Sequence, residues 1–192
     1  MKKFLCLAAT VLFASATAMD AAADSPTGIT SGPSVGDYLG PFAVTKVAGA
    51  TEDGVKEGSE LCYRCKNKQR PQVVVFTRST DGKVNELVKK LDQAMEEHSE
   101  DQLRVFVNVL SDSQETATKN AKSMASDSGA QNVPFVVPRD HATGPKNYSL
   151  SSDADITITM ANDSEVKGNL AFASAQDIDV DMVMDKVTSM LQ

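Results

Sequence analysis

The stretch QVVVFTR, Gln72 to Arg78, decides the fold class of this chain. Three consecutive valines and a phenylalanine leave the stretch without a polar face, which is typical of a central strand buried on both sides. A strand of this kind needs a sheet whose two faces are both covered by other elements. We therefore predict an α/β protein with QVVVFTR near the middle of its sheet.

The residues after this strand alternate between helical and strand patterns. Apolar residues recur at helical spacing from Val84 to Met95, and lysines and glutamates occupy the opposite face. A second buried strand is predicted over 103–110, and a second helix over 117–125 that stops at Gly129. A third strand is predicted over 133–137. This order favours strand-helix-strand units around a mainly parallel core.

Both ends of the chain add elements to this core. Upstream, Phe42 to Val47 predicts a short first strand, and 49–60 reads as a polar loop with several glycines. Downstream, 156–160 and 165–173 predict a hairpin, because apolar residues and threonines alternate before the Asn-Asp turn. A closing helix is predicted over 180–191, after aspartates that favour a helix start.

Composition bounds the size and the partners of the domain. The chain has 192 residues, of which 41% are hydrophobic and 23% charged, so one domain with one sizeable core is expected. The formal net charge is -7 and the isoelectric point is about 4.8. Nucleic acid and anionic membrane surfaces attract basic proteins, so both are excluded as main partners.

The first residues predict a secretory signal over 1–18. Lys2 and Lys3 precede a short apolar stretch that is too short to span a membrane, and small residues suited to cleavage follow. Cleavage after residue 18, or as late as residue 23, removes Cys6 and both lysines. Cleavage after residue 18 leaves 17 basic and 26 acidic residues, a net charge of -9. We expect an exported protein, periplasmic or secreted, with a flexible leader over 19–35 and a domain over 36–192.

The element order, together with the opening VGDYLGPFAV at 35–44, resembles the thioredoxin-like superfamily, in its peroxiredoxin and periplasmic thioredoxin-like branch. The resemblance covers about 36–191. It implies a three-layer α/β/α sandwich with a central mixed sheet and an N-terminal β extension. It also implies thiol-disulfide chemistry with protein thiols or disulfides as partners.

Two landmarks of that family are missing from their usual places. The reactive cysteine of the family follows the first core strand, but 77–82 contains no cysteine here. The family also has a cis-proline just before the hairpin, and 150–155 contains no proline. Any thiol chemistry must therefore come from another part of the chain.

The motif CYRC, Cys62 to Cys65, supplies the only two cysteines of the mature chain. Two cysteines at this spacing can form a disulfide within a tight turn and are the usual unit of dithiol exchange. Arg64 and Lys66 lie in a basic cluster that continues to Arg70, and positive charge near a thiol favours the thiolate. The motif precedes the central strand, whereas sites in open α/β sheets gather where parallel strands end.

Three functions remain open for this motif. The first is an exported thiol-disulfide oxidoreductase in which Cys62 and Cys65 are catalytic, the better exposed cysteine attacks, and Arg64 and Lys66 stabilise the thiolate. The second is a binding module without catalysis, in which a structural Cys62-Cys65 disulfide supports contact with an unknown protein partner. The third is metal or haem binding through the two cysteines. We predict no metal site and no resident cofactor, because only His98 and His141 could add imidazole ligands.

Overall fold

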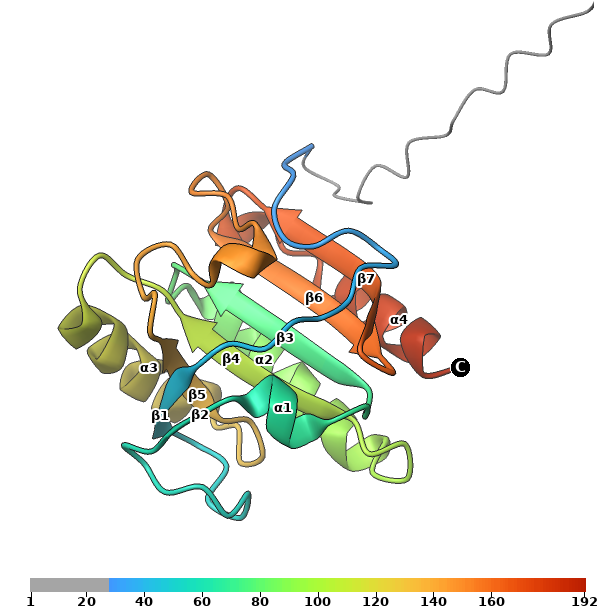
Figure 1. The fold of residues 1–192 in the computed structure, drawn as a ribbon, viewed down its shortest axis with the longest axis horizontal. Helices are drawn as coiled ribbons and strands as arrows, with labels where there is room; N and C mark the ends of the chain where they lie inside the picture. The colour runs from blue at the N-terminus through green and yellow to red at the C-terminus, as the bar shows by residue number, and fades with distance from the viewer. Residues whose placement is uncertain (1–27) are drawn as a thin grey trace, which may run out of the picture.

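A computed structural model describes residues 28–192, and these form one mixed sheet with helices packed on it (Figure 1). The predicted signal and residues 19–27 of the predicted leader lie outside the described residues. The elements, in chain order, are β1 (Val44–Ala48), β2 (Glu60–Leu61), α1 (Tyr63–Asn67), β3 (Gln72–Thr77), α2 (Gly82–Glu97), β4 (Arg104–Val109), α3 (Gln114–Ser128), β5 (Phe135–Pro138), η1 (Lys146–Tyr148), β6 (Ile156–Asn162), β7 (Glu165–Phe172), η2 (Ala175–Asp177) and α4 (Val180–Leu191).

The central strand is where the valine run predicted it. The seven strands lie in the order β2-β1-β5-β4-β3-β6-β7, and all six residues of β3 are buried. Strand β3 pairs in parallel with β4 and antiparallel with β6, with Val74 opposite Phe106 on one side and Thr159 on the other. β4 and β5 are parallel, while β1 and β7 pair antiparallel with their neighbours.

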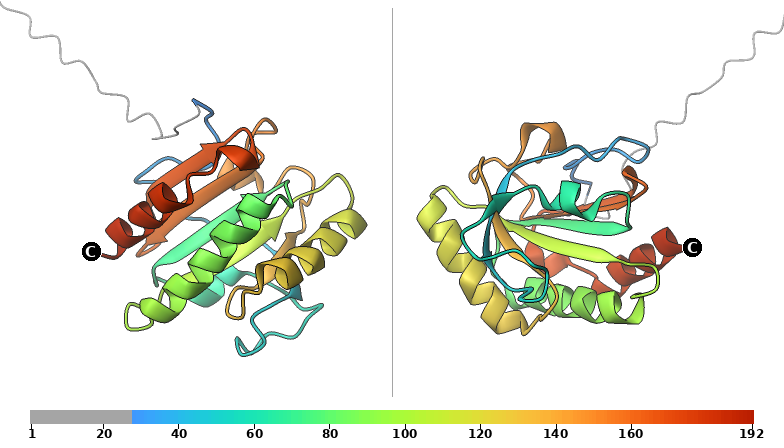
Figure 2. Two further views of the ribbon diagram at one scale, coloured as in Figure 1. Left: turned by 180° about the vertical axis from the view of Figure 1, so that it is seen from behind. Right: turned by 60° about the horizontal axis from the view of Figure 1, so that its bottom comes forward.

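The three long helices cover one face of the sheet, as the view from behind shows (Figure 2). Every second residue of β3, starting with Val73, points to this face and packs with the apolar stripe of α2, including Leu87 and Leu91. Ala121 of α3 and Val183 of α4 belong to the same core. The amphipathic patterns therefore predicted the correct helices, because tertiary packing buries the stripe that each pattern contains.

The opposite face is covered by α1, η1 and the extended segment 28–43 (Figures 1 and 2). Its core is aromatic: Phe42 lies 5.7 Å from Phe76 and 4.9 Å from Tyr148 between ring centroids, and Tyr63 of α1 stacks on Phe106 at 5.7 Å. The two covered faces confirm the predicted three-layer arrangement with a central mixed sheet, and β1 and β2 form the predicted N-terminal β extension.

Two segments differ from their predictions. No helix is predicted at the CYRC motif, but Tyr63–Asn67 form the short helix α1, with Cys62 as its N-cap. The packed part of the chain also begins upstream of residue 36, because Ser31 is 1% exposed, bonds to the hydroxyl of Thr157 at 2.7 Å and accepts from the Asn169 amide at 2.6 Å. Small polar residues can be fixed in this way by a buried polar cluster without any apolar pattern.

Candidate functional site

The two cysteines of the CYRC motif are joined by a disulfide at the start of α1. Their Cα atoms are 5.2 Å apart, and Cys62 is the N-cap of the helix, where its Sγ accepts a hydrogen bond from the backbone N–H of Cys65 at 3.0 Å. Cys65 is exposed, whereas Cys62 is partly buried. Of the two sulfur-bearing residues, Cys65 is therefore the one that faces solvent more openly.

The first residue between the cysteines, Tyr63, points into the protein. Its ring is 3% exposed and stacks on Phe106, and its hydroxyl donates to Asp53 Oδ2 at 2.5 Å. Burial, followed by the hydrogen bond to the Asp53 carboxylate and the charge of that carboxylate, raises the pKa of Tyr63 far above its ordinary value. The Tyr63 hydroxyl is thus held as a neutral donor to Asp53.

The second residue, Arg64, is also anchored. It is 7% exposed, its Nε donates to the carbonyl of Leu39 at 2.5 Å, and its guanidinium carbon lies 4.9 Å from the ring centroid of Tyr38. These contacts bind α1 to the extended segment 28–43. Its predicted role beside the thiolate remains a prediction, and Lys66, the other predicted residue, is exposed next to Cys65.

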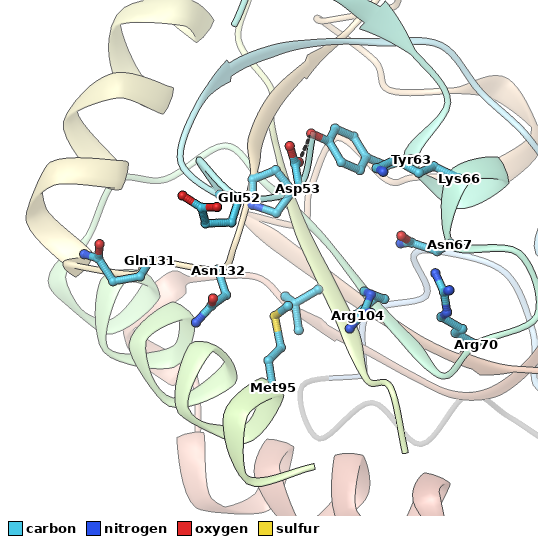
Figure 3. Close-up of a pocket in the computed structure, with 13 residues that line it drawn as sticks. Glu52, Asp53, Tyr63, Lys66, Asn67, Arg70, Met95, Arg104, Gln131 and Asn132 are labelled. Atoms are coloured by element: carbon cyan, nitrogen blue, oxygen red, sulfur yellow. Dashed lines mark hydrogen bonds between the residues drawn. The ribbon is translucent and has the colours of Figure 1, made fainter. Parts of the chain in front are cut away.

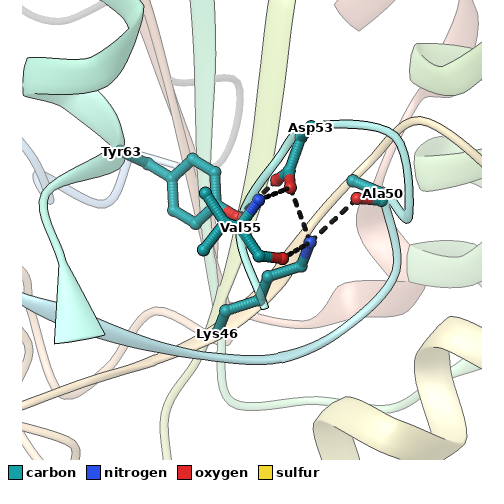
Figure 4. Close-up of polar contacts among 5 residues, drawn as sticks. All are labelled: Lys46, Ala50, Asp53, Val55 and Tyr63. Atoms are coloured by element: carbon teal, nitrogen blue, oxygen red, sulfur yellow. Dashed lines mark hydrogen bonds and ion pairs between the residues drawn. The ribbon is translucent and has the colours of Figure 1, made fainter. Parts of the chain in front are cut away.

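Asp53 connects Tyr63 to a buried lysine (Figure 4). The Lys46 ammonium is 1% exposed and donates to Asp53 Oδ1, to the carbonyl of Ala50 and to the carbonyl of Val55, each at 2.8 Å. Burial raises the pKa of Asp53, but the hydrogen bonds from Lys46, Tyr63 and the Val55 N–H, with the charge of Lys46, outweigh burial and lower it overall. The network holds the loop 50–58 against α1.

A cavity of about 330 Å³ lies beside α1, at the end of the sheet where β4 begins (Figure 3). Lys66, Asn67 and Arg70 line it from α1 and the residues that follow, and Arg104 lines it from β4. Burial, and then the nearby charge of Arg70, lower the pKa of Arg104. Two guanidinium groups therefore share this cavity at a cost in repulsion.

The usual site at the other end of β3 lacks a thiol, as predicted. There the backbone N–H of Arg78 donates to the Asp155 carbonyl at 2.8 Å, and Arg78 Nη1 donates to the Ala142 carbonyl at 2.6 Å. The described residues contain no cis peptide bond. Arg78 thus ties this end of β3 to the segments before β6 through its backbone and its side chain, and the cysteines lie near the amino end of β3.

The structure does not gather the two histidines around the cysteines. His98 Nδ1 lies 3.2 Å from Asp101 Oδ2, and His141 Nδ1 lies 2.9 Å from the Ser111 carbonyl. Within residues 28–192 no group of three or more His, Cys, Asp or Glu residues could hold a metal ion. In the same range, no helix has the length and apolar character that a membrane crossing requires.

No family model and no curated protein matches this chain. Several solved structures are similar to it in fold. The proposed thiol:disulfide interchange protein DsbE of Chlorobium tepidum has a TM-score of 0.59 at 12% identity, covering 82% of this chain and 98% of the other. Mycobacterium tuberculosis AhpC gives 0.59 at 15% identity, with the same two coverages. The thioredoxin domain of a thiol-disulfide oxidoreductase from Bacteroides vulgatus gives 0.55 at 8% identity, covering 83% and 99%.

Several residues of this region carry no recognisable signal in the sequence. Lys46 and Asp53 are seven positions apart across an irregular loop, a spacing with no recognised meaning. Asn67 and Arg104 line the same cavity although they belong to different elements, α1 and β4. Arg70 did belong to the predicted basic cluster, and that cluster was the one sequence signal that pointed to this cavity.

Proposed function

We propose that this chain, which has a thioredoxin-like fold, is an exported thiol-disulfide oxidoreductase that uses Cys62 and Cys65. The observation that carries the proposal is the disulfide at the start of α1, with Cys65 exposed to solvent. A thiolate reacts with a disulfide only when it can reach the sulfur. The exposed position of Cys65 makes it the attacking residue, and Cys62 resolves the intermediate.

The exchange is balanced in atoms and electrons. In the reduced protein, the Cys65 thiolate attacks one sulfur of a substrate disulfide, which forms a mixed disulfide and releases one substrate thiolate. The Cys62 thiolate then attacks Cys65 Sγ, which closes the Cys62-Cys65 disulfide and releases the second substrate thiolate. The pair loses two electrons and the substrate gains two, and the same steps run in reverse when the substrate is a dithiol.

Charge around the pair supports the thiolate form. Lys66 is exposed beside Cys65, and Arg64 is held in place one residue before it. In addition, the N–H of Cys65 donates to Cys62 Sγ, a hydrogen bond that favours a thiolate on Cys62, which resolves the mixed disulfide in the forward direction and is the leaving group in reverse. We propose Arg64 and Lys66 as thiolate-stabilising residues and protein thiols or disulfides as the partners.

Two measurements test the oxidoreductase. Thiol trapping across graded dithiol buffers gives the midpoint potential of the pair, and a value between about -120 and -270 mV is expected for an exchange catalyst. Cys62→Ser should accumulate mixed disulfides through Cys65, whereas Cys65→Ser should accumulate few, because its remaining thiol is partly buried. A pair that stays oxidised below about -300 mV would overturn the proposal.

One observation favours a second function, the binding module with a structural disulfide. Both residues between the cysteines are buried and bonded to other segments, Tyr63 to Asp53 and Arg64 to Leu39. A disulfide that closes such an anchored turn serves as a clasp for α1. In that case the double variant Cys62→Ser/Cys65→Ser keeps its partner binding and loses only stability.

Export rests on residues 1–18 and has its own test. When the full chain is expressed in a bacterium, the mature protein should be recovered from the periplasm or the medium. Its intact mass should correspond to a chain that begins at Met19, or at Asp24 for the later cleavage. Recovery of the uncut chain from the cytosol alone would contradict export.

A further inference from the structure

We propose that the cavity beside α1 binds a carboxylate group of an acidic peptide segment, between Arg70, Arg104 and Asn67. The proposal deepens the oxidoreductase function, on which it rests in one respect: the acidic segment belongs to the polypeptide that exchanges its disulfide with the pair. Carboxylate recognition by the cavity itself needs no redox chemistry and can be tested separately.

The first argument is unpaired positive charge. Arg70 donates to the side-chain oxygen of Gln102 at 2.8 Å, and Arg104 donates to the carbonyl of Leu103 at 2.9 Å. Among residues 28–192, neither arginine nor Lys66 has a carboxylate within ion-pair distance. Each arginine therefore keeps donors free for a ligand, and arginine donors suit the two oxygens of a carboxylate.

The second argument is a side-chain amide that lines the cavity without a protein partner. Asn67 is 5% exposed and lines the cavity, and its side chain makes no hydrogen bond to any residue that the structure describes. Figure 3 shows Asn67 between Lys66 and Arg70, near Arg104. Its amide atoms are not among the buried unpaired side-chain atoms of residues 28–192, so they reach the open part of the cavity, where a ligand can contact them. A ligand oxygen that accepts from this amide and from the two arginines satisfies all three groups.

The opposite wall limits the charge of the ligand. Glu52 and Asp53 line the cavity at the end away from the arginines (Figure 3), and Asp53 is already bonded to Lys46 and Tyr63. A highly charged anion that filled the cavity would meet the Glu52 carboxylate. A single carboxylate at the arginine end, with peptide atoms toward Gln131 and Asn132, avoids that repulsion.

The local charges decide recognition even though the mature protein is acidic. At physiological salt, charges farther apart than about 8 Å are largely screened, so the net charge of -9 acts weakly inside the cavity. Lys66 is the direct neighbour of Cys65 in α1. We place the disulfide of such a substrate toward Cys65 because Lys66, its direct neighbour, lines the same cavity.

The binding test uses the oxidised protein and NMR amide shifts. Acetyl-Glu-Glu-amide should move the resonances of Lys66, Asn67, Arg70 and Arg104, and acetyl-Gln-Gln-amide should not. Arg104→Gln and Arg70→Gln should each weaken binding about tenfold, since each removes a charged hydrogen-bond donor. Asn67→Asp should abolish it, while Lys89→Gln, which removes an exposed charge from α2, should leave it unchanged. Equal binding of both peptides, or of inorganic phosphate alone, would overturn the proposal.

The exchange test separates this proposal from the function. Two disulfide peptides, identical except for Glu or Gln beside the cysteine, are reduced by the wild type and by Arg104→Gln. The wild type should prefer the Glu peptide, and the variant should lose the preference. Exchange at equal rates overturns the substrate role of the cavity. Glu-peptide binding in the NMR test without exchange of either peptide overturns the oxidoreductase and leaves the carboxylate site in place.

Discussion

The hydroxyl of Tyr63 donates to Asp53 Oδ2 at 2.5 Å, while the other oxygen of the same carboxylate accepts from Lys46. Tyr63 lies inside the cysteine motif, and Lys46 lies on β1, outside it. The position of the disulfide therefore depends on a buried ion pair that is separate from the motif. Substitutions in this network can test this dependence.

Asp53→Asn removes the charged partner of a lysine that is 1% exposed. Breaking a buried ion pair from one side leaves an uncompensated charge, and a loss of about 3–5 kcal/mol in the free energy of unfolding is expected. Tyr63→Phe deletes one hydrogen bond only and should cost about 1 kcal/mol. Urea unfolding measures both, with Glu52→Gln on the same loop as control. An Asp53→Asn variant as stable as the control would contradict the network.

The two buried tyrosines predict a change at high pH. Burial raises the pKa of Tyr63, with help from Asp53, and burial raises that of Tyr148 against the opposing charge of Arg64. A raised pKa in the folded state means that stability is complete below about pH 10 and is lost as the pH rises above it. In a Tyr38→Phe variant, phenolate absorbance should appear together with the loss of near-ultraviolet circular dichroism. A phenolate signal that rises while the protein stays folded would show that the two rings are accessible.

The sequence predicts those strands and helices in which buried apolar residues recur at regular spacing or form a continuous run. Strand β3 was recognised because its valine run has no polar face, and α2 because one stripe of its surface is apolar. The helix α1 was missed because it has only five residues, and it is held by contacts of Tyr63 and Arg64 with distant segments rather than by its own pattern. The buried position of Ser31 was missed for the same reason, since its partners Thr157 and Asn169 lie 126 and 138 residues away.

The candidate site likewise has one part that the sequence predicts and one part that only the fold creates. The spacing of Cys62 and Cys65 indicates a disulfide from the sequence alone, and the structure contains it. The partners that surround α1 come from other elements, such as Asp53 from a loop and Arg104 from β4. No spacing rule connects these residues to the motif, because their proximity is created by the folding of the sheet.

Two glycines test how the loop that carries Asp53 is held. Gly49 and Gly54 have nearly equal φ angles of 75° and 74°, but an added Cβ would lie 2.3 Å from the Val133 carbonyl oxygen at Gly49 and would meet nothing within 4 Å at Gly54. Gly54→Ala should cost about 1–2 kcal/mol through left-handed strain alone. Gly49→Ala should cost about 1–3 kcal/mol more, because backbone atoms must move. Thermal unfolding of the two variants is compared, and the extra loss of stability in Gly49→Ala measures the clash with the Val133 carbonyl. Equal losses of stability would mean that the loop moves to accept the added methyl group.

The reactivity of the reduced pair tests the two basic neighbours of Cys65. Lys66 is exposed and can be neutralised without loss of packing, so Lys66→Gln should move the pH midpoint of iodoacetamide alkylation upward with unfolding unchanged. Arg64→Lys keeps the charge but loses the planar group over Tyr38 and the bond to Leu39, so it should lower stability by about 1–3 kcal/mol. Lys68→Gln, exposed and farther along the chain, is the matched control. If the alkylation midpoint moves equally in Lys68→Gln and Lys66→Gln, the thiolate responds only to the overall positive charge of the loop. If it does not move in Lys66→Gln, Lys66 does not stabilise the thiolate.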